Sequence, residues 1–206
     1  MFRIAIIAAL LFAAPAFAQQ TDFTKIDVTT TKVADGIFML QGAGGNIGLS
    51  TGPDGAFLID DEFAPLSDKI KAAIAKETDK PVDFLLNTHW HGDHTGGNEN
   101  FGSLGVHIVA QDNVRKRLKE GLTRANGGVT PPAPAIALPI ITFEKEITFY
   151  WNGQEIYAFH TGPAHTDGDS IVFFRTANVI HAGDIFFNGH YPFIDLESGG
   201  DLDGYI

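Results

Sequence analysis

The feature that most constrains this chain is a dense run of metal-binding side-chain types, His89-Trp90-His91-Gly92-Asp93-His94. It directly follows the apolar run 82–87, which predicts a buried strand, and it leads into the pair Gly96-Gly97. Polar chelators side by side at a strand end contribute little to packing. Because ligand sites in α/β sheets lie at the carboxyl ends of strands, the run predicts a metal site at the end of this strand.

The spacing within this run suits two metal ions rather than one. In an extended segment, His89 and His91 point the same way and can share one ion. The turn at Gly92 lets Asp93 and His94 face a second ion. The run alone is too short to complete either site, so further ligands are expected elsewhere in the chain.

Two later positions offer these ligands. His165 lies in a glycine-flanked turn after a predicted strand, and Asp184 follows another predicted strand in the sequence His-Ala-Gly-Asp. Either residue alone would be a weak signal. Together with the run they predict a three-histidine site of His89, His91 and His165 with an open position, and a bridging role for the Asp184 carboxylate between this site and the one that begins at Asp93 and His94.

The other histidines and one serine motif are weaker candidates. His107 lies on a predicted strand and is expected to pack or hydrogen-bond. His160 and His181 stand beside the ligand loops and are expected to be structural, with support of the ligands as the alternative. His190 follows closely and is kept as an alternative further ligand. Ser50 lies in Gly-Leu-Ser-Thr-Gly, but another strand and not a helix follows, so it is not expected to be a nucleophile.

Charge and cysteine content exclude several function classes. The chain has 206 residues, 44% of them hydrophobic, which is enough for one globular domain with a core. Its 14 Lys and Arg against 25 Asp and Glu give a net charge of −11, so we expect no nucleic-acid partner. With no cysteine, thiolate nucleophiles, zinc fingers and iron–sulfur clusters are excluded.

The first residues have the pattern of an export signal. A positive start at Met1-Phe2-Arg3, an apolar run over 4–14 and a small-x-small site at 16–18 predict a signal peptide at 1–18, which leaves 19–206 as the folded domain. The protein is therefore expected to be periplasmic or secreted. No run reaches the roughly 20 apolar residues of a membrane helix, so no membrane partner is expected.

Periodicity and turn signals predict one mixed α/β sandwich. The first strands are separated by Asp-Gly and glycine-rich turns and predict an antiparallel meander, and Asn152-Gly153 predicts a tight hairpin. The segment 127–139 is rich in proline and glycine and is expected to be an irregular connection within the same domain. The predicted strands are 26–28, 37–40, 47–51, 56–59, 82–87, 106–110, 147–151, 155–159, 171–174 and 179–182, and the predicted helices are 64–77 and 111–120.

The motif His-x-His-x-Asp-His, with His165 and Asp184 in this order, resembles the metallo-β-lactamase fold superfamily of metallohydrolases over about residue 26 to the chain end. The resemblance implies an αββα sandwich of mixed sheets with a dinuclear, usually zinc, site between them. Because the family's second metal usually takes a last histidine from a later strand, it also implies that the second half of the fold is incomplete here. The implied ligands are His89, His91 and His165 for the first metal, Asp93 and His94 for the second, and Asp184 between them.

The expected activity is metal-dependent hydrolysis. A bound zinc ion lowers the pKa of its water to about 7, and a second ion can stabilise the developing oxyanion. Asp93 is the predicted catalytic residue, which would orient the metal-bound hydroxide and shuttle its proton. We therefore expect one or two Zn²⁺ ions and a small-molecule substrate with an acyl bond: a β-lactam, a lactone, a thioester or another ester.

Two alternatives stay open. One is an iron-dependent sulfur oxygenase of the same superfamily, because histidine and aspartate ligands accept iron as well as zinc. The other is a metal-binding fragment without catalysis. Asp184 stands where several β-lactamases of the superfamily have cysteine, so the chain looks more like the aspartate-bearing branches. No oligomeric state is predicted.

Overall fold

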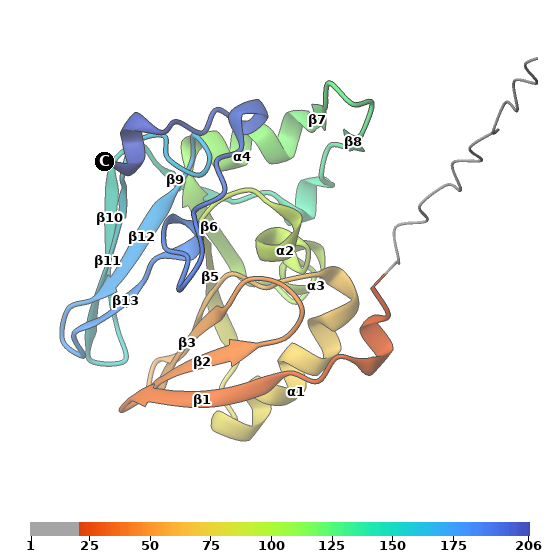
Figure 1. Ribbon diagram of the computed structural model, residues 1–206. Coiled ribbons are helices and arrows are strands. Elements are labelled where there is room, and N and C mark those ends of the chain that lie inside the picture. The colour runs from red at the N-terminus through yellow and green to blue at the C-terminus, as the bar shows by residue number, and fades with distance from the viewer. Residues whose placement is uncertain (1–20) are drawn as a thin grey trace, which may run out of the picture.

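The computed structural model describes residues 21–206, which form two β-sheets packed face to face with helices on one side (Figure 1). The predicted signal peptide at 1–18 lies outside the described residues. Within the described part of the chain, no helix is both long and apolar enough to cross a membrane.

The larger sheet has seven strands in the order β1-β2-β3-β4-β5-β6-β9. The first four pair antiparallel, which confirms the meander, and β5, β6 and β9 continue the sheet in parallel. The expected strand at 26–28 is wrong: the strand begins at Thr29, and Ile26 and Val28 instead pack against the core after a 3₁₀ turn. The bounds are β1 Thr29–Ala34, β2 Ile37–Gln41, β3 Ile47–Gly52, β4 Gly55–Ile59, β5 Val82–Asn87, β6 His107–Gln111 and β9 Ile141–Phe143.

The smaller sheet is an antiparallel set of four strands, β10 Glu146–Trp151, β11 Gln154–His160, β12 Ser170–Phe174 and β13 Val179–His181. Asn152 and Gly153 connect the first two with φ of 52° and 70°. Positive φ at both central residues is the geometry of a two-residue type I′ hairpin, so the Asn-Gly prediction is confirmed.

Helices form largely where the sequence predicts them. A 3₁₀ turn at Ala64–Leu66 leads into α1 Ser67–Glu77, and α4 spans Asp112–Glu120. Two short helices, α2 Gly92–Thr95 and α3 Asn98–Gly102, lie in the polar segment after β5 and were not predicted. The predicted irregular connection contains β8 Val129–Thr130, which pairs with β7 Leu122–Thr123, and a 3₁₀ turn at Ala135–Ala137. Three further 3₁₀ turns follow β13, at Gly183–Ile185, Leu196–Ser198 and Asp203–Tyr205.

The two largest of the three apolar clusters among the described residues hold these layers together, and the third packs α4 beside Trp90. One lies between the large sheet and α1 and α3, where Leu58, Ile70 and Phe101 are fully buried. The other lies between the two sheets and contains Phe57 and Phe174. Every residue of β4 is buried because both faces of this central strand are covered. The packing brings loops of both sheets to the carboxyl end of β5.

The mixed-sheet sandwich is thus confirmed, and its helices belong to the larger sheet. In the described residues no α-helix follows β9, and Tyr150 and Ile180 of the smaller sheet are exposed, 78% and 61%. Among residues 21–206 no layer of helices covers this face of the smaller sheet.

Candidate metal centre

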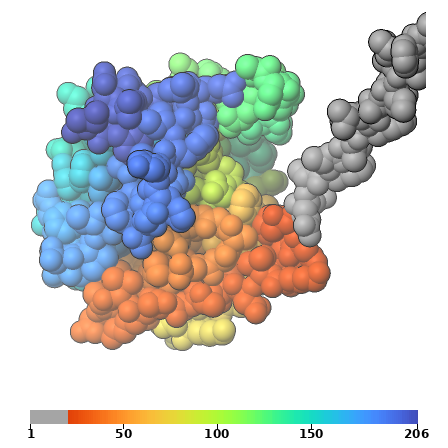
Figure 2. Space-filling model, in the orientation of Figure 1, coloured from red at the N-terminus to blue at the C-terminus, as the bar shows by residue number. Residues whose placement is uncertain are grey.

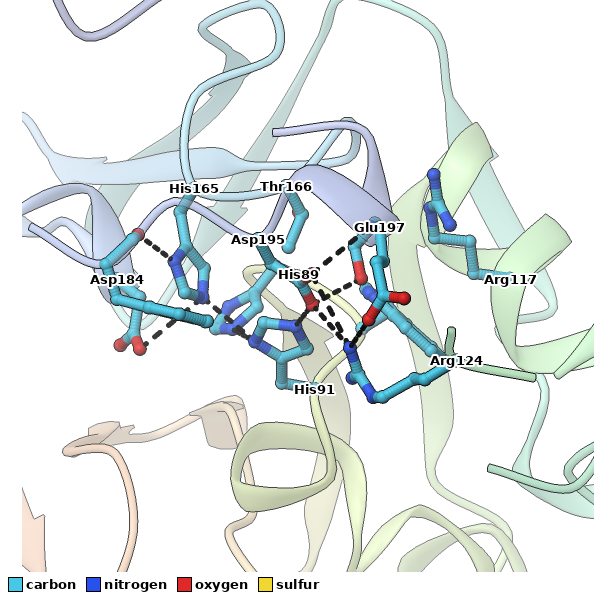
Figure 3. Close-up of polar contacts among 12 residues, drawn as sticks. His89, His91, Arg117, Arg124, His165, Thr166, Asp184, Asp195 and Glu197 are labelled. Atoms are coloured by element: carbon cyan, nitrogen blue, oxygen red, sulfur yellow. Dashed lines mark hydrogen bonds and ion pairs between the residues drawn. The ribbon is translucent and has the colours of Figure 1, made fainter. Parts of the chain in front are cut away.

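Five of the six predicted ligands converge at one edge of the sandwich. His89 and His91 follow β5 directly, and His94 lies in α2. His165 comes from the loop between β11 and β12, and Asp184 from the turn after β13, so the smaller sheet supplies these two (Figure 3). Two groups of three side chains each place their ligand atoms within 4.8 Å of one another: His89, His91 and His165, and His89, His94 and Asp184.

The geometry of the first group fits a tetrahedral ion. His91 Nδ1 lies 3.2 Å from His89 Nε2 and 2.9 Å from His165 Nε2. Nitrogen ligands at 2.0–2.1 Å from a tetrahedral zinc ion stand about 3.3 Å apart. His89 and His165 are buried and His91 is nearly so, which limits the competition of bulk water for these nitrogens.

The second group contains a polar atom without a hydrogen-bond partner. His94 Nε2 is fully buried and makes no hydrogen bond, although Asp184 Oδ1 lies 3.1 Å away. A buried nitrogen that faces other ligand atoms and donates to none of them is suited to a metal ion. The other Asp184 oxygen lies 3.6 Å from His165 Nε2, so this carboxylate stands between the two groups, where the sequence predicts a bridge.

Asp93 is the exception among the predicted ligands. Its Oδ2 lies 3.8 Å from His94 Nε2, its side chain is 37% exposed, and it belongs to neither group. Its role as a ligand and as the catalytic residue stays a prediction. The exposed His190 also lies outside both groups. His107, His160 and His181 each place a ring nitrogen near a backbone carbonyl, as expected for structural histidines.

Two carboxylates that the sequence analysis missed orient the candidate ligands. Asp195 Oδ2 lies 2.8 Å from His91 Nε2, and Asp60 Oδ2 lies 2.8 Å from His94 Nδ1. Each contact uses the ring nitrogen that does not face the cluster, and such contacts set ring orientation and tautomer at metal sites. Asp60 directly follows β4 and could have been noticed as an acid after a buried strand. Asp195 lies in a loop and carries no local signal.

The other two histidines are held by neighbouring polar groups. His165 Nδ1 lies 2.7 Å from the Phe193 carbonyl oxygen, and His89 Nδ1 lies 3.1 Å from Thr88 Oγ1. Thr88 in turn donates its backbone N–H and its hydroxyl to Asp60, both at 2.7 Å. All four rings are therefore held before any ion arrives.

Burial and neighbouring charges decide the protonation of the cluster. Burial, with help from nearby His94, holds the pKa of His89 well below its usual value, and burial also lowers the pKa of His91. Burial opposes the charge of His94, but Asp60 and Asp184 outweigh it and raise the pKa of this histidine. Because metals bind neutral imidazole, two rings are ready for an ion and His94 would release a proton on binding.

A groove of about 410 Å³ adjoins the second group. It is lined by His94 and Asp184 together with Met39 of β2, Ile180 of β13 and the exposed Phe186. Among the described residues that line it there is no Lys or Arg. Figure 2 shows the blue C-terminal segment beside the orange N-terminal strands, with yellow-green residues from the middle of the chain visible between them.

Comparison with known proteins agrees with this arrangement. A family model described as the metallo-beta-lactamase superfamily matches residues 40–206. The hydroxyacylglutathione hydrolase of Nitrosococcus oceani is 37% identical over 82 residues, which are 37% of this chain and 30% of that protein, so the match spans under a third of the curated relative.

Solved structures share the fold at low identity. A metallo-beta-lactamase from Pontibacter korlensis superposes with a TM-score of 0.70 at 20% identity, over 87% of this chain and 81% of that one. BJP-1, a subclass B3 metallo-beta-lactamase of Bradyrhizobium japonicum, gives 0.61 at 22% identity, over 73% and 58%. With the family match over residues 40–206 and the histidine cluster at the expected sheet edge, the chain belongs to the metallo-β-lactamase superfamily.

Proposed function

We propose that this protein is a metal-dependent hydrolase that cleaves an acyl bond of a small molecule. One observation carries the proposal: the two ligand groups share His89, are spanned by the Asp184 carboxylate, and each borders a hollow, the groove at His94 and Asp184 and a second pocket at His91. A structural metal site is closed by protein ligands, whereas a catalytic site keeps a position for water or substrate. Three histidines leave such a position in the first group.

Zinc is the proposed ion because imidazole nitrogens and a carboxylate oxygen are its usual ligands in a chain without cysteine. Iron accepts the same donors, so the identity of the metal is part of the proposal. A bound zinc ion would lower the pKa of the water it holds and would polarise the acyl carbonyl of the substrate.

The chain's own residues complete the proposed chemistry. Asp195 and the Phe193 carbonyl hold His91 and His165 with the correct nitrogen toward the cluster. Asp93, whose Oδ2 lies 3.8 Å from His94 Nε2, would accept a proton from the attacking water in this proposal, the role that the sequence predicts. The groove beside Asp184 would hold the acyl group.

The lining of the groove favours neutral substrates. β-Lactams and glutathione thioesters carry carboxylates, and no Lys or Arg among the described residues of this groove would pair with one. Arg124 lines the second pocket, beside His91 and Asp93, but it is already paired with Asp195 and Glu197. The net charge of −11 also repels anions. We therefore place neutral esters and lactones first, with thioesters second because the curated relative is named a hydroxyacylglutathione hydrolase.

The test is a substrate panel with metal analysis of the same protein. Zinc and iron per chain would be measured first, followed by turnover of p-nitrophenyl butyrate, a γ-lactone, S-lactoylglutathione and a chromogenic cephalosporin. We expect turnover of the ester and the lactone, and we expect a chelator to abolish it. His165→Ala should also abolish this turnover, whereas the matched surface variant His107→Ala should retain it. Metal-loaded protein that hydrolyses none of the four would contradict the proposal and favour a metal-binding protein without this activity.

Export is a separate part of the proposal. The predicted signal peptide at 1–18 leads us to expect the protein in the periplasmic or secreted fraction of expressing cells. Cell fractionation with and without these residues checks this, and retention of both forms in the cytoplasm would contradict it.

A further inference from the structure

Glu62 is a fully buried acid whose side chain, among the described residues, accepts hydrogen bonds from backbone N–H groups alone. Its Oε1 accepts the N–H of Gly42 at 2.7 Å, and its Oε2 accepts those of Ala43 and Gly44, both at 2.9 Å. These three successive N–H groups belong to the connection 42–46 between β2 and β3, which we call the glycine loop. One carboxylate thus binds most of this loop by charge-assisted hydrogen bonds.

The backbone of Glu62 is unusual in a way that supports a specific role. It has φ of 53°, in the left-handed region that residues other than glycine seldom adopt. Such a conformation persists only where the surroundings enforce it. Here the Glu62 carbonyl accepts the Gly97 N–H at 3.2 Å, and the preceding Asp61 N–H donates to the His94 carbonyl at 3.0 Å. The segment therefore ties the glycine loop to the backbone of the histidine motif.

The glycine loop lies directly on the candidate metal centre. The Gly45 N–H donates to the Asp93 carbonyl at 3.3 Å, and a Cβ atom at Gly45 would overlap the His94 ring. Gly44, Gly45 and Asn46 also line the groove next to His94 and Asp184. The loop is thus one wall of the groove, and its distance from the site depends on how it is held.

We propose that Glu62 is a positioning residue that holds the glycine loop against His94, beside the groove, through its three backbone hydrogen bonds. Ala43 and Gly44 are exposed, so we expect solvent to reach their amides once the carboxylate is removed. Without the carboxylate the loop would move away from His94 and widen the groove. That Glu62 holds the loop in place does not depend on any assumed activity, whereas the effect of the loop on substrate binding rests on the proposed function.

Backbone amide hydrogen exchange of the full chain, detected by NMR, tests the geometric part. Glu62→Ala removes all three acceptors, and we expect exchange at Gly42, Ala43 and Gly44 to become at least about tenfold faster, since each bond to a charged group is worth roughly that factor or more. Amides of β5 should keep their rates once global stability is taken into account.

A conservative variant makes the expectation sharper. Gln at position 62 keeps one oxygen, which can retain the pair of bonds from Ala43 and Gly44 while its NH₂ group faces the Gly42 N–H. Glu62→Gln should therefore speed exchange at Gly42 more than at the other two amides. Ile70→Ala, a buried change on α1, serves as a control that lowers global stability without touching the loop.

The outcomes separate the two proposals. Unchanged protection of the three loop amides in Glu62→Ala would overturn the positioning role, whatever the enzyme does. If exchange speeds up as expected and the wild type is active, KM should rise by about tenfold with a smaller change in kcat, because the groove and not the ligand cluster is disturbed. Faster exchange in a protein without turnover would support the role of Glu62 and count against the proposed activity alone.

Discussion

Replacement of Asp195 by Asn tests whether the orientation of His91 depends on a distant carboxylate. Asp195 Oδ2 lies 2.8 Å from His91 Nε2 and accepts the Ser198 hydroxyl at 2.6 Å, with Arg124 Nη1 at 3.3 Å (Figure 3). The other oxygen, Asp195 Oδ1, accepts the Ser198 N–H at 3.2 Å. An Asn has only one oxygen, so its NH₂ group must face either the His91 ring or this N–H. The isosteric change therefore removes the hydrogen-bond pattern while it keeps the volume.

The magnitude follows from the pKa of Asp195. Burial raises this pKa, but hydrogen bonds from Ser198 and His91 outweigh it and lower the value to about 2 from 3.8. With a side chain only 5% exposed, this shift corresponds to about 2 kcal/mol of folding stability at neutral pH. Loss of a partner that orients a metal ligand typically costs a further 10–100-fold in metal affinity.

Two measurements check these numbers. Competition with a chromogenic chelator should show zinc affinity lowered by about 10–100-fold in Asp195→Asn. Urea unfolding of metal-free protein at pH 7 should show a loss of about 2 kcal/mol. Because the folded-state pKa lies below the unfolded value, the wild type holds this stability above about pH 4 and loses it as the pH falls toward 2, so the difference between the proteins should narrow in that range.

Glu197→Gln is the matched control. Glu197 shares Arg124 with Asp195, at 3.4 Å, but does not touch His91. It should leave zinc affinity within about threefold of the wild type, since exposed ion pairs contribute little. If Asp195→Asn binds zinc as tightly as this control, the reasoning that Asp195 orients His91 is refuted.

Three further predictions concern the site and the core. His165→Ala should abolish tight zinc binding at the three-histidine group, and unchanged stoichiometry by elemental analysis would count against that ligand set. Burial raises the pKa of Asp61, so the folded state holds a proton that the unfolded state releases above pH 3.8, and the free energy of unfolding should fall as pH rises. In urea unfolding from pH 5 to 8, Asp61→Asn should make this dependence on pH weaker. A dependence on pH equal to that of the wild type would argue against a protonated Asp61. Phe57→Ala, between the two sheets, should cost about 3–5 kcal/mol by the same method, and a loss under 1 kcal/mol would show that this core is not well packed.

Local sequence signals predicted most of the regular elements. The run 82–87 is β5 without change, and the predicted helix 64–77 is the 3₁₀ turn followed by α1. Asn152-Gly153 predicted its hairpin because the turn needs positive φ at two neighbouring residues, which is a local property. The sequence predicted these elements because each depends on residues that are close together in the chain.

Other features were missed because their causes are not local. The short helices α2 and α3 have no apolar periodicity, since packing of the loop against the large sheet decides their shape. Ile26 and Val28 alternate like a strand, yet they cover the core beside α1. Asp60, Glu62 and Asp195 look like ordinary acids in the sequence, and only their partners give them a role.

By itself, the sequence determined which side chains are available to bind a metal and that they follow strand ends. The tertiary structure decided which of them meet. His165 and Asp184 reach His89 only because the smaller sheet packs on the larger one, while Asp93, although part of the motif, stays outside both ligand groups. Asp195 lies 104 residues from His91 and contacts its ring. Spacing along a chain sets the direction of neighbouring side chains, but distances between remote segments depend on how the buried faces of two sheets fit together.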